Sequence, residues 1–216
     1  MSQLTDLFHR VYDVEGLIRW GGSLVLVVVI FAETGLLLGF FLPGDSLLVT
    51  AGLLSAGGMF NVWLLGVMLS LAAILGQQLG YAVGQAAGAR LFTREDSLLF
   101  KRSHLLRAHE FYERHGGKTV VIARFMPIFR TFVPVVAGAA RMDYGAYTLY
   151  NVVGGVLWIW GMLLTGYSLG RYVPGIGKHI DVVIIVVIAL SLMPGAIAWL
   201  RRQRTAAAPP APPTEV

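Results

Sequence analysis

The stretch VVIARFMPIFRTFVPVVAGAA, residues 120–140, contains two arginines and two prolines in otherwise apolar sequence: Arg124, Pro127, Arg130 and Pro134. A charge at bilayer depth is costly unless it is paired or faces water, so a charged residue inside an apolar segment indicates a functional site. On an ideal helix the two arginines would point about 120° apart. Pro127 lies between them and Pro134 beyond, which predicts a re-entrant hairpin broken by these prolines.

An earlier apolar stretch, FAETGLLLGFFLPGDSLLVTAG at residues 31–52, carries two acids, Glu33 and Asp45. A straight helix would separate them by about 18 Å along its axis and about 120° around it, too far for one site. Pro43 and Gly44 interrupt the segment directly before Asp45. They predict a second re-entrant hairpin that brings the two acids to similar depths.

Hairpins entering from opposite faces would meet near the middle of the membrane, with acids on one and guanidinium groups on the other. Arginine stays protonated and binds phosphate bidentately, so Arg124 and Arg130 suit an anionic lipid headgroup. A carboxyl group in a poorly solvated site can carry a proton, which suits Glu33 and Asp45 for proton coupling. The alternative is structural, with the four charges only holding the hairpins together. Against it, a buried ion pair is often no more stabilising than apolar packing.

The composition is that of an all-α polytopic membrane protein. Of the 216 residues, 56% are hydrophobic and only 13% charged, where a soluble domain carries about 25% charged residues. Several weakly charged stretches approach the roughly 20 residues that span a bilayer. They are residues 22–42, 46–57, 62–84, 119–138, 144–170 and 181–200.

The polar segments define the organisation of the chain. We predict an amphipathic N-terminal segment at 1–20, a membrane domain at 21–204 and a disordered Ala/Pro-rich tail at 205–216. Within the membrane domain we predict halves at about 21–88 and 119–174, a basic interfacial loop at 89–118 and a last span at 181–200. No cleavable signal peptide is evident, because charges mix with apolar residues throughout the first 20 positions.

Charge distribution predicts the orientation. The net charge is +5, and the basic residues gather between the apolar stretches. This pattern is typical of orientation signals and contacts with anionic lipids, and we expect no nucleic-acid partner. The positive-inside rule places residues 89–118 and the C-terminus in the cytoplasm, and residues 171–180 on the outer side.

An internal repeat occurs at an offset of about 86 residues. If 89–118 is inside and 171–180 outside, the equivalent long spans run in opposite directions and the repeat is inverted, a design that recurs in transporters. The matched pairs are Ala51-Gly52 with Ala137-Gly138, Gly80-Tyr81 with Gly166-Tyr167, and Gly84 with Gly170.

Three runs together resemble the bacterial DedA family of inner-membrane proteins, within the VTT or SNARE-associated superfamily. They are ETGLLLGFFLPGDSLLVTAG at 33–52, FYERHGGKTVVIARFMPIFRTFVPVVAGAARM at 111–142, and YNVVGGVLW at 150–158. The resemblance covers residues 25–200. It implies about four spanning helices plus two opposed re-entrant hairpins. It also implies lipid translocation, notably of undecaprenyl phosphate and in some members of phospholipids, driven by the proton motive force.

The family's essential charges correspond to Glu33, Asp45, Arg124 and Arg130 in this chain. One departure is Gln77, where the family commonly has Asp, so an additional proton-carrying acid is in doubt. The expected partners are therefore a lipid with an anionic headgroup, protons and anionic membrane lipids. A homo-oligomer is compatible with the sequence.

Other residues offer weaker indications. His104, His109 and His115 have spacings that do not share one helical face, so we expect no metal site. Asn151 either lines the pathway or bonds between helices. Trp158 is predicted, with other aromatic residues, to be an interfacial anchor. No nucleotide-binding or hydrolase motif occurs, and we expect no cofactor.

Three rival functions remain open at this point. One is a proton-coupled transporter or channel for small ions, which would use the same acids. Another is an enzyme such as a lipid phosphatase, for which the arginine segment offers only the hydroxyl of Thr131 and no histidine. The third is a scaffold in which the charges serve folding. The leading hypothesis is a flippase for polyprenyl phosphate, with no enzymatic activity.

Overall fold

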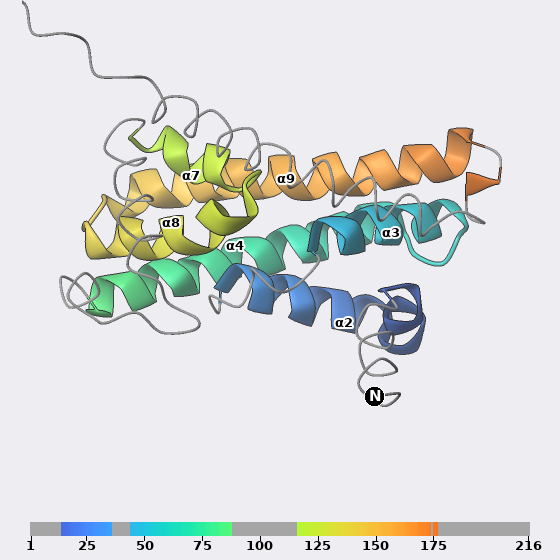
Figure 1. Cartoon of the computed structure of the whole chain (residues 1–216), viewed down its shortest axis with the longest axis horizontal. Coiled ribbons are helices and arrows are strands. Elements are labelled where there is room, and N and C mark those ends of the chain that lie inside the picture. The colour runs from blue at the N-terminus through green and yellow to red at the C-terminus, as the bar shows by residue number, and fades with distance from the viewer. Residues whose placement is uncertain (1–13, 36–43, 88–115, 174, 177–216) are drawn as a thin grey trace, which may run out of the picture.

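The computed structural model describes residues 14–35, 44–87, 116–173 and 175–176, and these ranges are helical apart from their turns (Figure 1). The predictions on the loop at 89–118, apart from 116–118, on the last span at 181–200 and on the tail lie outside the described residues, as does Pro43. The helices are α2 (Val14–Gly35), α3 (Gly44–Ala56), α4 (Val62–Ala87), α7 (Lys118–Ala123), α8 (Pro127–Ala139) and α9 (Tyr144–Tyr172).

Short polar residues start the two long helices. The side chain of Asn61 accepts hydrogen bonds from the backbone N–H groups of Trp63 and Leu64, at 3.0 and 3.2 Å. The Asp143 side chain accepts one from the N–H of Ala146 at 2.8 Å. Because the first N–H groups of a helix have no intrahelical partner, such caps fix where a helix begins.

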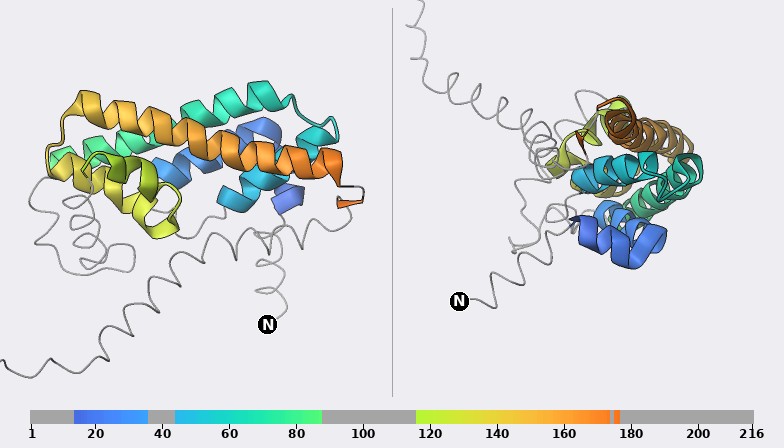
Figure 2. Two further views of the ribbon diagram at one scale, coloured as in Figure 1. Left: turned by 90° about the horizontal axis from the view of Figure 1, so that it is seen from above. Right: turned by 90° about the vertical axis from the view of Figure 1, so that its right-hand side faces the viewer.

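The long helices α4 and α9 lie alongside each other and run in opposite directions, and the shorter helices pack on them (Figures 1 and 2). Helix α3 packs mainly against α9, and α8 packs mainly against α4. Helix α2 packs mainly against α4, and α7 against α9 and α8. Helix α3 of the first half therefore packs on the long helix of the second half, and α8 of the second half packs on the long helix of the first.

Glycines of the repeated motif form these crossed contacts. A side chain at Gly52 would overlap the backbone of α9 at Leu163, and one at Gly138 would overlap the backbone of α4 at Tyr81. Small residues at such points let helix backbones approach closely, which is a main source of stability between helices in membranes. Glycines at matching positions of the two halves thus make equivalent helix contacts.

Two of the described helices, α4 and α9, are long and apolar enough to cross a membrane. Helices α3 and α8 have 13 residues each, about 20 Å at 1.5 Å per residue, which is shorter than a hydrocarbon core of about 30 Å. The predicted span at 119–138 is broken between Ala123 and Pro127, as the proline pattern predicted.

The outer surface is apolar and the interior holds charge. Large exposed apolar side chains lie along α4 and α9, and the interior encloses polar and charged residues that are at most 9% exposed. Such a surface suits contact with lipid chains. The exposed residues include Trp63, Leu64, Leu71, Leu75, Leu149 and Leu157, and the buried ones include Glu33, Asp45, Gln77, Arg124, Arg130 and Asn151.

The N-terminal boundary differs from the predicted one. The predicted amphipathic segment ended at residue 20, but α2 begins at Val14 and continues to Gly35. The change of direction falls at Gly22, whose φ of 58° is open to glycine because it has no Cβ atom. Ile18, before this kink, is fully buried in a hydrophobic core cluster, so at least this part of the segment packs with the other helices.

Pro134 does not break a helix, contrary to the prediction, because it lies inside α8. A proline has no N–H, so the carbonyl of Arg130, four residues earlier, loses its usual donor. The Nε2 atom of Gln77, on α4, donates a hydrogen bond to that carbonyl at 3.3 Å. Gly80, one turn later on α4, leaves room for the Pro134 ring. Helix α4 thereby compensates for the proline, and α8 remains continuous.

Replacing Gln77 with Leu should lower the melting temperature of the purified protein in detergent, because it leaves the buried Arg130 carbonyl without a donor. Such a loss is worth about 1–3 kcal/mol. In a Pro134→Ala background the same replacement should cost much less, since an alanine restores the helical N–H at that position. Gln85→Leu on the exposed face of α4 is the matched control. Equal losses in both backgrounds would contradict the assignment.

Candidate functional site

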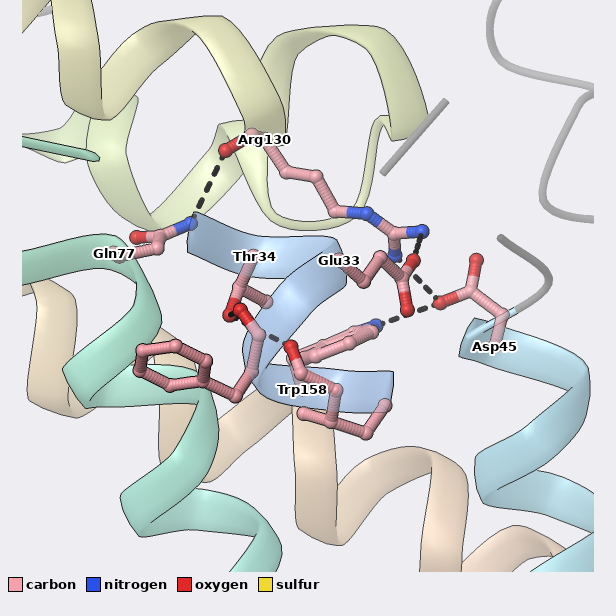
Figure 3. Close-up of polar contacts among 8 residues, drawn as sticks. Glu33, Thr34, Asp45, Gln77, Arg130 and Trp158 are labelled. Atoms are coloured by element: carbon pink, nitrogen blue, oxygen red, sulfur yellow. Dashed lines mark hydrogen bonds and ion pairs between the residues drawn. The ribbon is translucent and has the colours of Figure 1, made fainter. Parts of the chain in front are cut away.

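Arg130 joins the two acids in the interior of the helix bundle (Figure 3). Its Nη1 atom donates to Oδ1 of Asp45 at 2.9 Å, and its Nη2 atom donates to Oε1 of Glu33. The three side chains come from α8, α3 and α2, and none of these residues is more than 9% exposed. One guanidinium group therefore connects helices from both halves of the chain.

Trp158 is the fourth member of this cluster. Its indole Nε1–H donates to the same Oδ1 atom of Asp45 at 2.9 Å, and Cζ of Arg130 lies 5.0 Å from the centroid of its ring. Trp158 is the central residue of α9 (Tyr144–Tyr172) and is 1% exposed. A guanidinium group above an indole ring is attracted by its π-electrons, so Trp158 contacts both charges of the Asp45–Arg130 pair.

The start of α3 is built to receive the acids. Asp45 lies in the first turn of α3, where the helix dipole favours negative charge. A side chain at Gly44 would overlap the carboxylate of Glu33, so the absence of a Cβ atom there lets Glu33 reach this helix end. Gly44 thus starts α3 and makes room for the Glu33 carboxylate.

Arg124 occupies a separate position. It follows the last residue of α7, is 1% exposed, and donates from Nη2 to Oδ1 of Asn151 on α9. The amide of Asn151 is oriented in turn, because its Nδ2 atom donates to the carbonyl of Ile74 on α4 at 3.1 Å. The Nε and Nη1 atoms of Arg124 have no hydrogen-bond partner among the described residues. Arg124 is a buried cation with a neutral partner.

Two glycines of α9 hold the Arg124 side chain against that helix. A Cβ atom at Gly154 would lie 3.1 Å from Cδ of Arg124, and one at Gly155 would lie 3.3 Å from Cζ. Larger residues at these positions would push the guanidinium group away from Asn151. The YNVVGGVLW run therefore supplies the amide, the two glycines and Trp158 on one helix.

The predicted site residues are thus divided between two places. Glu33, Asp45 and Arg130 meet as predicted, but Arg124 does not join the acids. The sequence predicts hairpins that meet with acids on one and guanidinium groups on the other. Of the two guanidinium groups, that of Arg130 meets the acids, whereas Arg124, which follows α7, has Asn151 as its partner. The like charges of Arg124 and Arg130 repel each other through the interior.

Sequence reasoning missed the role of Trp158. It was predicted to be an interfacial anchor, but it lies buried at the middle of α9. The available signal was its position: residue 158 is central in the apolar stretch 144–170, whereas an interfacial anchor lies near the end of a span. Asn151 makes the predicted hydrogen bond between helices.

The arrangement combines an ion cluster of two acids and one arginine with a second arginine that has no acid partner among the described residues. Each charge is shielded from lipid by the surrounding helices, where an electrostatic interaction is stronger than in water. Within the described ranges no group of three metal-ligating side chains occurs. The three histidines considered for metal binding lie outside those ranges.

Comparison with known proteins gives consistent matches. The VTT domain family matches residues 42–168. Protein DedA of Escherichia coli (strain K12) is 42% identical over 185 residues, covering 85% of this chain and 84% of the relative. An uncharacterized membrane protein of Mycobacterium leprae (strain TN) is 42% identical over 172 residues, covering 80% of this chain and 77% of the relative.

A further relative is the inner membrane protein YqjA of Escherichia coli (strain K12), 36% identical over 148 residues, covering 68% of this chain and 67% of the relative. No solved structure matches the chain significantly. The matched region contains Arg124 and the ion cluster apart from Glu33, which precedes the VTT domain match. The chain therefore belongs to the DedA family of membrane proteins and contains its VTT domain.

Proposed function

We propose that this protein carries a lipid with an anionic headgroup across the membrane, with undecaprenyl phosphate as the favoured cargo. The observation that supports this most is Arg124, a fully buried cation whose Nε and Nη1 atoms have no partner among the described residues. A buried charge without a counter-charge is unfavourable. A phosphate group would supply that charge and bind the guanidinium group bidentately.

Arg130 and the two acids would couple this binding to protons. Glu33 and Asp45 hold Arg130 while they are ionised. Protonation of a carboxyl group removes its charge, weakens its bond to Arg130 and frees that arginine to join Arg124 on the phosphate. The lipid tail would stay in the bilayer, so only the headgroup needs a polar route.

The helix arrangement supports a lipid pathway between two opposed hairpins. In our proposal α2–α3 and α7–α8 are opposed re-entrant hairpins, α4 and α9 span the membrane, and the two halves form an inverted repeat. The crossed packing of α3 on α9 and α8 on α4 supports this. We place the protein in the bacterial inner membrane, as the name of the relative YqjA states for that protein, with the C-terminus cytoplasmic and no enzymatic activity.

The direct experiment is leaflet exchange in liposomes that contain the purified protein. Labelled undecaprenyl phosphate would be followed beside a phosphatidylethanolamine probe, with and without a pH gradient. Selective exchange that depends on the gradient is expected. Exchange of both lipids without a gradient would indicate a scramblase, and a proton current without lipid exchange would indicate an ion transporter.

Arg124→Ala should abolish exchange of undecaprenyl phosphate while the amount of protein in the membrane stays near wild type. Arg124→Lys should recover little, because an ammonium group cannot form the planar bidentate contact. The exposed Arg171→Ala, near the end of α9, is the matched control and should keep exchange within about twofold of wild type, the size of effect typical for a surface change. Normal exchange by Arg124→Ala would contradict the proposed headgroup site.

Swapping the charges of Glu33 and Arg130 tests whether the ion cluster takes part in lipid transport or only holds the helices together. The double variant Glu33→Arg with Arg130→Glu keeps an ion pair between α2 and α8 but moves the guanidinium group to the other helix. We expect its melting temperature to recover relative to either single variant, whereas lipid exchange stays lost. Recovery of exchange would show that the pair serves folding alone.

A further inference from the structure

The two acids bind different nitrogen atoms of the Arg130 guanidinium group. Asp45 is bonded to Nη1 and Glu33 to Nη2. The Nε atom of Arg130 is buried and has no hydrogen-bond partner among the described residues. In an arginine side chain the Nε–H and one N–H of Nη2 point in parallel, and this edge is a fork that binds carboxylate or phosphate. Glu33 is therefore bonded to one of the two nitrogen atoms, Nη2, that a phosphate on this edge would use.

The acid on Nη1, Asp45, has a second side-chain donor. The Oδ1 atom of Asp45 accepts from Arg130 and from the indole N–H of Trp158, both at 2.9 Å. The ring of Trp158 also lies beneath the guanidinium group, 5.0 Å from Cζ to the centroid. Asp45, Arg130 and Trp158 thus contact one another in all three combinations, and they come from α3, α8 and α9.

Glu33 has no comparable support. Its Oε1 atom is bonded to Arg130, and its carboxylate lies against the backbone at Gly44. The hydrogen bonds described for it include no second side-chain donor. Glu33 thus has one described side-chain hydrogen bond, whereas Asp45 has two.

We propose that Trp158 is a positioning residue that keeps Arg130 bound to Asp45, so that an anionic headgroup displaces Glu33 and takes the Nε and Nη2 edge. This rests on the proposed function, because it concerns the same headgroup site. Arg130 then keeps its contacts with Asp45 on α3 and Trp158 on α9. The phosphate replaces only the contact with Glu33 on α2. The ligand class is a monoester phosphate, and its tail contributes nothing to this exchange.

Equilibrium binding measurements test whether a phosphate displaces Glu33 from Arg130, and they do not require lipid transport. The full-length protein in nanodiscs would be titrated with undecaprenyl phosphate, and with neutral undecaprenol to measure the contribution of the tail. Glu33→Gln should tighten phosphate-lipid binding, because it weakens the competitor for that edge. Asp45→Leu and Trp158→Phe should each weaken it about tenfold, the effect expected from losing one hydrogen bond to a charged group.

Matched variants separate positioning from packing. Trp160→Phe, two residues along α9, should bind like wild type, because the Trp160 ring lies against that of Trp63, with the ring centroids 5.5 Å apart. Trp158→Phe keeps the aromatic ring and loses only the N–H, so its effect should vanish in the Asp45→Leu background. Wild-type binding by Trp158→Phe, an equal loss in both backgrounds, or weaker binding by Glu33→Gln would each overturn the proposal.

A spectroscopic readout makes failure of this inference distinguishable from failure of the proposed function. In ultraviolet resonance Raman spectra, the hydrogen-bond-sensitive indole band of one tryptophan should shift in Asp45→Leu, which leaves Trp158 in place. An unchanged band would overturn the positioning role even if lipid exchange is normal. If wild type binds the phosphate lipid no better than undecaprenol, the proposed headgroup site is wrong, whatever the band shows.

Discussion

The ion cluster around Arg130 is the interaction on which the arrangement of the helices depends. Its guanidinium group is bonded to acids from α2 and α3 and rests on a tryptophan of α9, while its own helix, α8, packs on α4. Removing one member would leave a buried charge without its partner, which is far more costly than never having buried the pair. The cluster therefore fixes the relative positions of α2, α3, α8 and α9 at the middle of the bundle.

The backbone around the cluster is adapted to this purpose. Helix α3 starts at a glycine that leaves room for a carboxylate, and α9 has two adjacent glycines where a guanidinium group lies against it. Helix α8 tolerates an internal proline because Gln77 donates to the carbonyl that the proline leaves free. In lipid, where water cannot satisfy such groups, each irregularity has to find its partner within the protein.

The two arginines differ in their surroundings, and this difference gives the proposed mechanism its order. Arg130 is neutralised by acids in the structure as it stands, whereas Arg124 has only the amide of Asn151 among the described residues. An anion would therefore meet Arg124 first and gain Arg130 only after an acid gives it up. In the proposed mechanism the tail of the lipid would stay in the bilayer, and the exposed apolar side chains of α4 and α9 suit contact with it.

The sequence by itself determined the helical membrane class, the breaks near Gly44 and Pro127, and the identity of four charges that the structure buries. It could do so because a charge or a helix break in apolar sequence is costly wherever the chain folds. Only the tertiary structure decided which charges meet, that Trp158 is buried among them, and that Pro134 stays within a helix. These depend on side chains up to 113 residues apart, such as Asp45 and Trp158, and local patterns carry no information about such contacts because helix packing creates them.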